Sequence, residues 1–265
     1  MKRLILGMIY ILFIMFLNKA AIYAEQLSAD DIIKKANIAS YYSGKDGSAD
    51  VKMIITDSQG RQRIREFRIL RLNIQQGGEQ KFYVYFKKPA DVAKMVFMVW
   101  KHLGRDDDRW LYLPALDLVR RIAASDKRSS FVGSHFVYED VSGRGIDEDT
   151  HKLIGADEKY YKIKNIPKDT KGVEFAYYIV YIDKKTFLPM KAEYYDKENK
   201  LIKVIRALEV KNIDGYPTVV KSEVRDMVRG GNTLMEFSNV KYNVGLTEDI
   251  FTERYLRRPP VKWIR

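Results

Sequence analysis

The feature that most constrains this chain is a succession of short β-type segments separated by hairpin turns. From residue 50 onward, turn-forming stretches such as Asp57–Gly60 and Asn212–Gly215 recur about every eight to twelve residues. Between the turns, runs such as Leu201–Val210 alternate apolar and polar side chains, as a half-buried strand does. This spacing is typical of antiparallel all-β domains, which form sandwiches or barrels.

The pattern predicts a mainly β domain of about eleven or twelve strands that follows one N-terminal helix. The helix covers residues 28–42, with Ser28 as its N-cap and Gly44 after its end. The polar, glycine-rich residues 125–147 predict a long connection with one or two short helices, and such connections are often functional. The expected strands are residues 50–56, 63–72, 81–87, 94–102, 109–113, 118–122, 158–165, 174–183, 188–196, 200–211, 217–229 and 232–243.

The N-terminus has the pattern of a secretory signal. Lys2 and Arg3 precede the apolar run Leu4–Leu17, and small residues follow it up to Ala24. The run is shorter than the roughly 20 residues that a membrane-spanning helix needs. We therefore expect residues 1–24 to be a signal peptide that is cleaved after Ala24, which places the protein in the periplasm; an uncleaved N-terminal anchor is the alternative.

The composition narrows the classes of partner. The sequence contains no cysteine, so no disulfide is expected. It shows no repeat of fixed period and no low-complexity linker, so residues 25–265 are expected to form a single domain. The net charge is +12, and without Lys2, Arg3 and Lys19 of the leader it is +9. A basic surface favours anionic partners such as a membrane surface, and export makes nucleic acid the least fitting of them. A basic but merely solvated surface is the other interpretation.

Several predicted strands are apolar on both faces, among them Phe82–Phe86, Met95–Trp100 and Phe175–Ile182. One helix cannot cover so large a sheet. The sheet therefore either curls over a fully packed core or encloses a cavity, in which an acyl chain would gain about 0.8 kcal/mol per buried methylene. The candidate lining residues are Phe82, Val84, Phe86, Phe97, Trp100, Trp110, Tyr112, Phe175, Ile179 and Tyr181. Trp100 and Trp110 could instead be ordinary core residues that do not line a cavity.

Three segments, residues 86–100, 107–125 and 129–140, carry a family resemblance. The middle one is the most telling, with Trp110–Pro114 followed by Val119–Ile122. Together they resemble the bacterial outer-membrane lipoprotein-sorting proteins, the group similar to the periplasmic carrier LolA and its partner LolB. The resemblance implies an unclosed antiparallel β-barrel with a helical and loop lid over a hydrophobic cavity. It also implies a carrier that shuttles lipid or lipoprotein acyl chains between envelope membranes, with an inner-membrane transporter of the resistance-nodulation-division type as a partner.

Charged residues near the long connection suggest two further roles. We expect Arg120 and Arg121 to stand at the cavity mouth near an anionic headgroup, unless they are simply solvent-exposed. Glu139 and Asp140 are expected to pair with Arg120, Arg121 or Arg144 and so fix the connection.

The sequence predicts no catalytic residue, metal site or cofactor. The three histidines lack metal-binding spacing. The stretch Gly133–His135 lacks the second glycine of a nucleophile elbow. Beside the carrier, two alternatives remain open: a non-catalytic envelope adaptor or scaffold for a membrane transporter, and a hydrolase acting on envelope glycans or lipids.

Overall fold

The computed structural model describes residues 27–265, and within them the chain forms one thirteen-stranded antiparallel sheet. The prediction of a mainly β, unclosed barrel-like fold with few helices is confirmed. The predicted signal peptide, residues 1–24, lies outside the described residues.

The bounds of the elements follow the hairpin spacing of the sequence. The strands are β1 (Asp46–Thr56), β2 (Gln62–Asn73), β3 (Gln80–Lys88), β4 (Val96–Lys101), β5 (Asp108–Leu113), β6 (Leu118–Arg121), β7 (Asp149–Ala156), β8 (Tyr160–Pro167), β9 (Tyr177–Asp183), β10 (Pro189–Tyr195), β11 (Leu201–Ile213), β12 (Tyr216–Asp226) and β13 (Asn232–Tyr242). The α-helices are α2 (Ala29–Tyr41), α3 (Tyr138–Ser142), α4 (Arg254–Arg257) and α5 (Val261–Ile264). Short 3₁₀ turns are η1 (Pro114–Leu116), η2 (Ala124–Asp126), η3 (Ile146–Glu148) and η4 (Glu248–Phe251).

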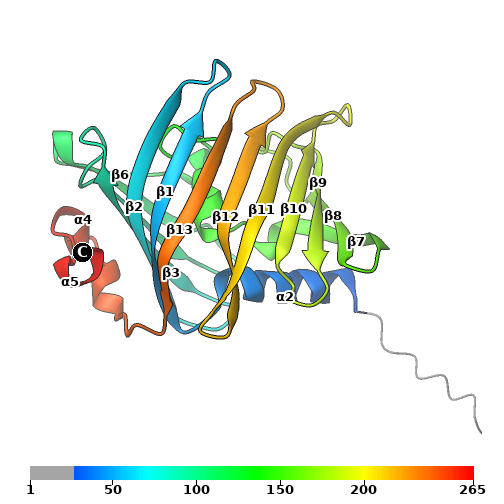
Figure 1. Ribbon diagram of the computed structural model, residues 1–265, viewed down its shortest axis with the longest axis horizontal. Helices are drawn as coiled ribbons and strands as arrows, with labels where there is room; N and C mark the ends of the chain where they lie inside the picture. Colours follow the sequence, from blue (N-terminus) through cyan, green and yellow to red (C-terminus); the bar gives the residue numbers. More distant parts are fainter. Residues whose placement is uncertain (1–26) are drawn as a thin grey trace, which may run out of the picture.

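The sheet is continuous but not closed. Its order is β6-β5-β4-β3-β2-β1-β13-β12-β11-β10-β9-β8-β7, so the first strand pairs with the last and the two edges are β6 and β7. Figure 1 shows this sheet strongly curved, with α2 along its lower end. Because β6 and β7 are consecutive in the sequence but stand at opposite edges, the chain between them must cross from one edge to the other.

Strand β7 was not predicted from the sequence, so the expected number of strands was about eleven or twelve and not the thirteen that form. Its residues alternate between half-buried or buried and exposed, and its sequence is mostly polar or small. Edge strands bury little apolar surface, so their hydrophobic signal is weak. The omission does not change the fold.

Helix α2 covers the concave face of the later strands. Ser28 caps it as predicted, since its Oγ accepts a hydrogen bond from Asp31 N at 3.1 Å. Ile32 and Ala36 are buried against a cluster from β8 and β9 that includes Ile163. Within residues 27–265, no helix has the length and apolar character needed to span a bilayer.

The C-terminal segment, residues 243–265, packs on the opposite face of β2–β5. Phe251 and Leu256 are fully buried there. Two hydrogen bonds fix the segment: Trp100 Nε1 donates to Phe251 O at 2.7 Å, and Tyr83 Oη donates to Tyr255 O at 2.7 Å. This cover explains why β3 and β4 are apolar on both faces, because each face meets a packed layer.

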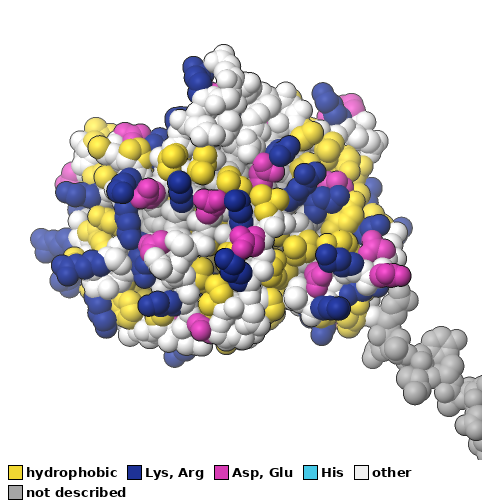
Figure 2. Space-filling model, in the orientation of Figure 1, with side chains coloured by type: hydrophobic (Ala, Val, Ile, Leu, Met, Phe, Trp, Pro, Cys, Tyr) yellow, Lys and Arg dark blue, Asp and Glu magenta, His cyan; other side chains and the backbone are white. Residues whose placement is uncertain are grey.

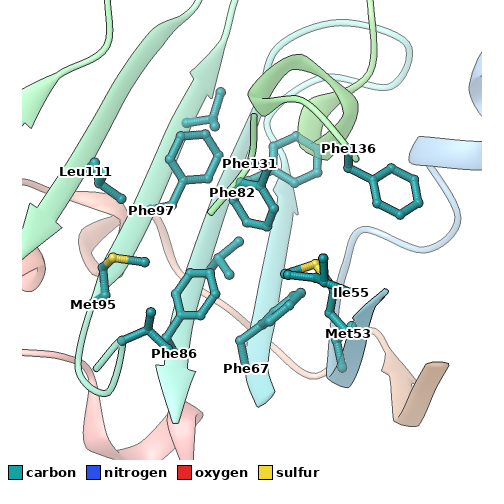
Figure 3. Close-up of a cluster of buried hydrophobic side chains, with 14 of the residues drawn as sticks. Met53, Ile55, Phe67, Phe82, Phe86, Met95, Phe97, Leu111, Phe131 and Phe136 are labelled. Carbon is teal, nitrogen blue, oxygen red and sulfur yellow. The ribbon is translucent and has the colours of Figure 1, made fainter. Parts of the chain in front are cut away.

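The connection between β6 and β7, residues 122–148, acts as a plug inside the curve of the sheet. Its Phe131 is 1% exposed and stands at the centre of an aromatic cluster. The rings around it, at centroid distances of 5.6–6.2 Å, are Phe67, Phe86, Phe97 and Tyr138. Figure 3 shows Phe131 and Phe136 facing the side chains that project from the strands. The plug therefore fills the concave face of β1–β5.

Candidate functional site

A cavity of about 500 Å³ lies on the concave face, beside the plug and under α2. This volume falls within the range of ligand sites, about 300–1,000 Å³. The wall is mostly apolar and draws on α2, the plug and strands from both halves of the sheet. Representative lining residues are Ala49, Phe82, Val84, Val180, Ala192 and Phe237.

Small residues on the strands leave this space open. Ala49 of β1, Ala192 of β10 and Ala207 of β11 all line the cavity, so their methyl groups form part of its wall. Large side chains at the same positions would occupy the hollow. The cavity is thus a consequence of residue size at inward-facing positions.

Arg71 of β2 places a cation in the cavity wall. Its guanidinium donates hydrogen bonds to the carbonyl oxygens of Tyr41 and Ser43, at the end of α2. Burial lowers the pKa of Arg71, although arginine remains charged at neutral pH. Among the described residues it has no ion pair with a carboxylate, and its guanidinium lies 6.0 Å from the centre of the Tyr242 ring. The cavity wall is therefore mostly apolar, and Arg71 adds a positive group to it.

A buried carboxylate, Glu139 of α3, fixes the plug beside the cavity. Its oxygens lie 2.5 Å from Arg128 Nη1, 3.1 Å from Lys127 Nζ and 3.4 Å from Arg144 Nη1. Burial alone would raise the pKa of Glu139, but the charges of these three residues outweigh burial and hold its pKa below the usual value.

The same network ties the plug to neighbouring strands. Arg144 also reaches Asp149 at the start of β7, at 2.9 Å, and Arg128 reaches Glu174 at 2.6 Å. The predicted pairing of Glu139 with Arg144 is confirmed. Asp140 pairs instead with Lys203 of β11, at 3.3 Å. Such long-range partners leave no local signal in the sequence.

Four of the predicted lining residues share the concave face. Phe82 and Val84 line the cavity itself. Phe86 and Phe97 point to the same side but lie under the plug, close to Phe131 (Figure 3). Phe175 is buried beside the Arg128 guanidinium, 4.8 Å from its ring centre, and is not part of the cavity wall.

The other predicted lining residues lie on the opposite face, which corrects the expected placement. Trp100, Trp110 and Tyr112 pack against the C-terminal segment. Trp100 stands three residues after Phe97, and an odd spacing in a strand reverses the side to which a residue points.

The two remaining candidates, Ile179 and Tyr181 of β9, show the same reversal. The residues of β9 that face the cavity are Tyr178, Val180 and Ile182. Because residues 177–182 are all apolar or aromatic, the sequence does not indicate whether the odd-numbered or the even-numbered residues point inward.

Arg120 and Arg121 do not stand at the cavity, contrary to the expectation. Both lie exposed on the edge strand β6. Arg120 Nη2 lies 3.5 Å from Asp126, and Arg121 pairs with Asp108. The cationic residues of the cavity wall are instead Arg71, Arg144, Lys191 and Lys241. They come from four distant parts of the chain, so only the fold reveals them.

Comparison with known proteins places this fold in a family. A DUF1329 family protein from Desulfovibrio piger is 30% identical, with a TM-score of 0.78 over 86% of this chain and 97% of that chain. This chain belongs to the DUF1329 family. A family model described as "Uncharacterized protein" matches residues 78–258. The search of curated proteins gave no match.

Two further structures connect the DUF1329 fold with LolA. An outer membrane lipoprotein-sorting protein domain from Vibrio parahaemolyticus is 29% identical, with a TM-score of 0.77 over 87% of this chain and 98% of that chain. A LolA superfamily protein from Nitrosomonas europaea is 19% identical, with a TM-score of 0.68 over 87% of this chain and 100% of that chain, and shares the fold. The DUF1329 chain is thus LolA-like, as the sequence segments indicated.

Proposed function

We propose that this protein binds lipid acyl chains in its cavity and carries them through the periplasm between envelope membranes. The observation that carries the proposal is the apolar cavity of about 500 Å³ inside a LolA-like sheet. A chain of about sixteen carbons would gain roughly 10 kcal/mol from burial before the cost of ordering it. The similar domain from Vibrio parahaemolyticus is described as lipoprotein-sorting, which fits this class of cargo.

The wall of the cavity suits an amphiphile with an anionic end. Its apolar residues would hold the hydrocarbon, while Arg71 offers a cation without a carboxylate partner among the described residues. A lipid or lipoprotein of this kind needs no reacting group in the protein. The proposal therefore requires no catalysis, metal or cofactor. A partner of the resistance-nodulation-division type stays a prediction, as does the signal peptide that would deliver the protein to the periplasm.

Lipid transfer between vesicles tests the proposal. Ala192 faces the cavity, so Ala192→Phe places a ring in the space that the acyl chain would take. We expect the purified protein to accelerate movement of a pyrene-labelled lipid from donor to acceptor vesicles, and the variant to lose at least 90% of that acceleration, about a tenfold loss.

The matched control is Ala156→Phe, at the exposed end of β7 and away from the cavity. It makes the same chemical change and should transfer lipid like the parent. Equal transfer by parent and Ala192→Phe, with circular dichroism showing both folded, would contradict the carrier and favour the adaptor interpretation.

A further inference from the structure

The end of the described chain is strongly basic. Residues 254–265 contain five basic and no acidic side chains. All five are exposed: Arg254, Arg257, Arg258, Lys262 and Arg265. Among the described residues, only Arg257 of these makes an ion pair, with Asp117 at 3.0 Å. Figure 2 shows Lys and Arg side chains gathered at the left of the molecule, where Figure 1 places α4 and α5.

This basic segment is held firmly against the sheet. Leu256 is fully buried, and Arg68 Nε of β2 donates a hydrogen bond to Trp263 O at 2.6 Å. Together with the hydrogen bond from Tyr83 to Tyr255 O, these contacts fix the backbone of α4 and α5. The basic side chains on the outer side of the two helices therefore form a preorganised surface and not a loose tail.

Exposed apolar side chains lie next to these cations. The ion pair of Arg257 with Asp117 brings α4 to the tip of the β5–β6 hairpin. On either side of Asp117, Leu116 is 71% exposed and Leu118 is 46% exposed. Val261, within the basic segment, is 52% exposed. Exposed apolar side chains that gather in one patch often mark a surface that binds a protein or a membrane.

A mixture of cations, apolar side chains and aromatic rings is typical of surfaces that bind membranes at the headgroup level. Here Lys262 Nζ lies 4.4 Å from the centre of the Trp263 ring. A purely acidic protein surface would pair with the cations but would give the exposed leucines no apolar environment. An anionic bilayer offers phosphates to the cations and its acyl boundary to the leucines.

We propose that this surface, defined by Arg254, Arg258, Lys262, Leu116 and Leu118, docks the protein on a membrane rich in anionic phospholipid. It lies on the face of the sheet opposite to the cavity. Docking and acyl-chain binding are therefore separate properties of the molecule, and the first does not depend on the second.

Vesicle co-sedimentation of the full chain tests the docking. The probes are vesicles of phosphatidylcholine alone and vesicles that also contain phosphatidylglycerol. We expect binding only to the anionic vesicles, and weaker binding at high salt. Each basic residue near an anionic surface contributes about 1 kcal/mol, so the triple variant Arg254→Gln, Arg258→Gln, Lys262→Gln should bind roughly 100-fold more weakly.

The matched control changes three exposed lysines elsewhere on the surface, Lys168→Gln, Lys171→Gln and Lys185→Gln, and so lowers the net charge by the same amount. It should lose much less binding. A second variant, Leu116→Ser, should weaken binding without any change of charge. The proposal is overturned if the parent binds both kinds of vesicle alike or binds neither, or if the control loses as much as the triple variant. Acyl-chain loading, measured separately, should be the same in all variants.

Discussion

At the scale of single residues, the buried carboxylate of Glu139 is the group that most needs compensating charges. It is 2% exposed, and three cations surround it. A buried ion network of this kind does not by itself make a protein more stable than an apolar core would. Removing one member is costly, however, because the remaining charges stay buried without compensation. The network therefore specifies one position for the plug beside the cavity.

Glu139→Gln should destabilise the protein by roughly 3 kcal/mol, since it leaves Arg128, Lys127 and Arg144 short of one negative charge. The free energy of unfolding in urea measures the effect. The matched control is Asp126→Asn, which breaks the half-exposed pair with Arg120 and should cost less than about 1 kcal/mol. Equal losses in the two variants would show that the network around Glu139 contributes no more than a surface pair.

Acid should weaken the same contact. The pKa of Glu139 is lower in the folded protein than the usual value near 4.3. A lowered pKa adds stability that is fully present above about pH 4.3 and is lost as the pH falls through the folded value. The free energy of unfolding of the parent should therefore fall below about pH 5, and that of Glu139→Gln should fall less steeply. Parallel pH profiles of unfolding free energy in the parent and in Glu139→Gln would contradict this prediction.

At the scale of elements, the sequence predicted which segments are strands far better than which way their residues point. The predicted helix, 28–42, differs from α2 by one residue at each end. Most strands were predicted because hairpin turns separate them. The predicted side was wrong for residues of three strands that are apolar on both faces, β4, β5 and β9, because alternation of apolar and polar residues then carries no information. The cover by residues 243–265 creates that ambiguity for β4 and β5.

The position of the tryptophans, away from the cavity, leads to a spectroscopic prediction. The three tryptophans, Trp100, Trp110 and Trp263, all belong to the cluster under the C-terminal segment. Binding of a soluble fatty acid in the cavity should therefore leave the intrinsic tryptophan emission nearly unchanged. Phe237→Trp places a reporter in the cavity wall, and its emission should shift to shorter wavelength when the acyl chain enters. A large shift in the parent, or none in this variant with fatty acid bound, would place the ligand elsewhere.

At the scale of the whole molecule, the two faces of one curved sheet carry different structures. The concave face holds the plug and the cavity, and the opposite face holds the C-terminal segment with its basic surface. Pairing of β1 with β13 joins the early and late strands into this single sheet. The open barrel was predicted from the resemblance to the LolA group, and the cavity from that resemblance and from strands that are apolar on both faces. The places of Arg71 and Ala192 in the wall could not be predicted, because which residues of distant strands face the same cavity is decided by the fold.

Native mass spectrometry of the protein equilibrated with palmitate tests directly whether the cavity binds an acyl chain. We expect a one-to-one complex in the parent and in Ala156→Phe, and its loss in Ala192→Phe, whose added ring fills the cavity. If the parent binds no palmitate, or if Ala192→Phe binds it as well as the parent does, acyl chains do not occupy this cavity.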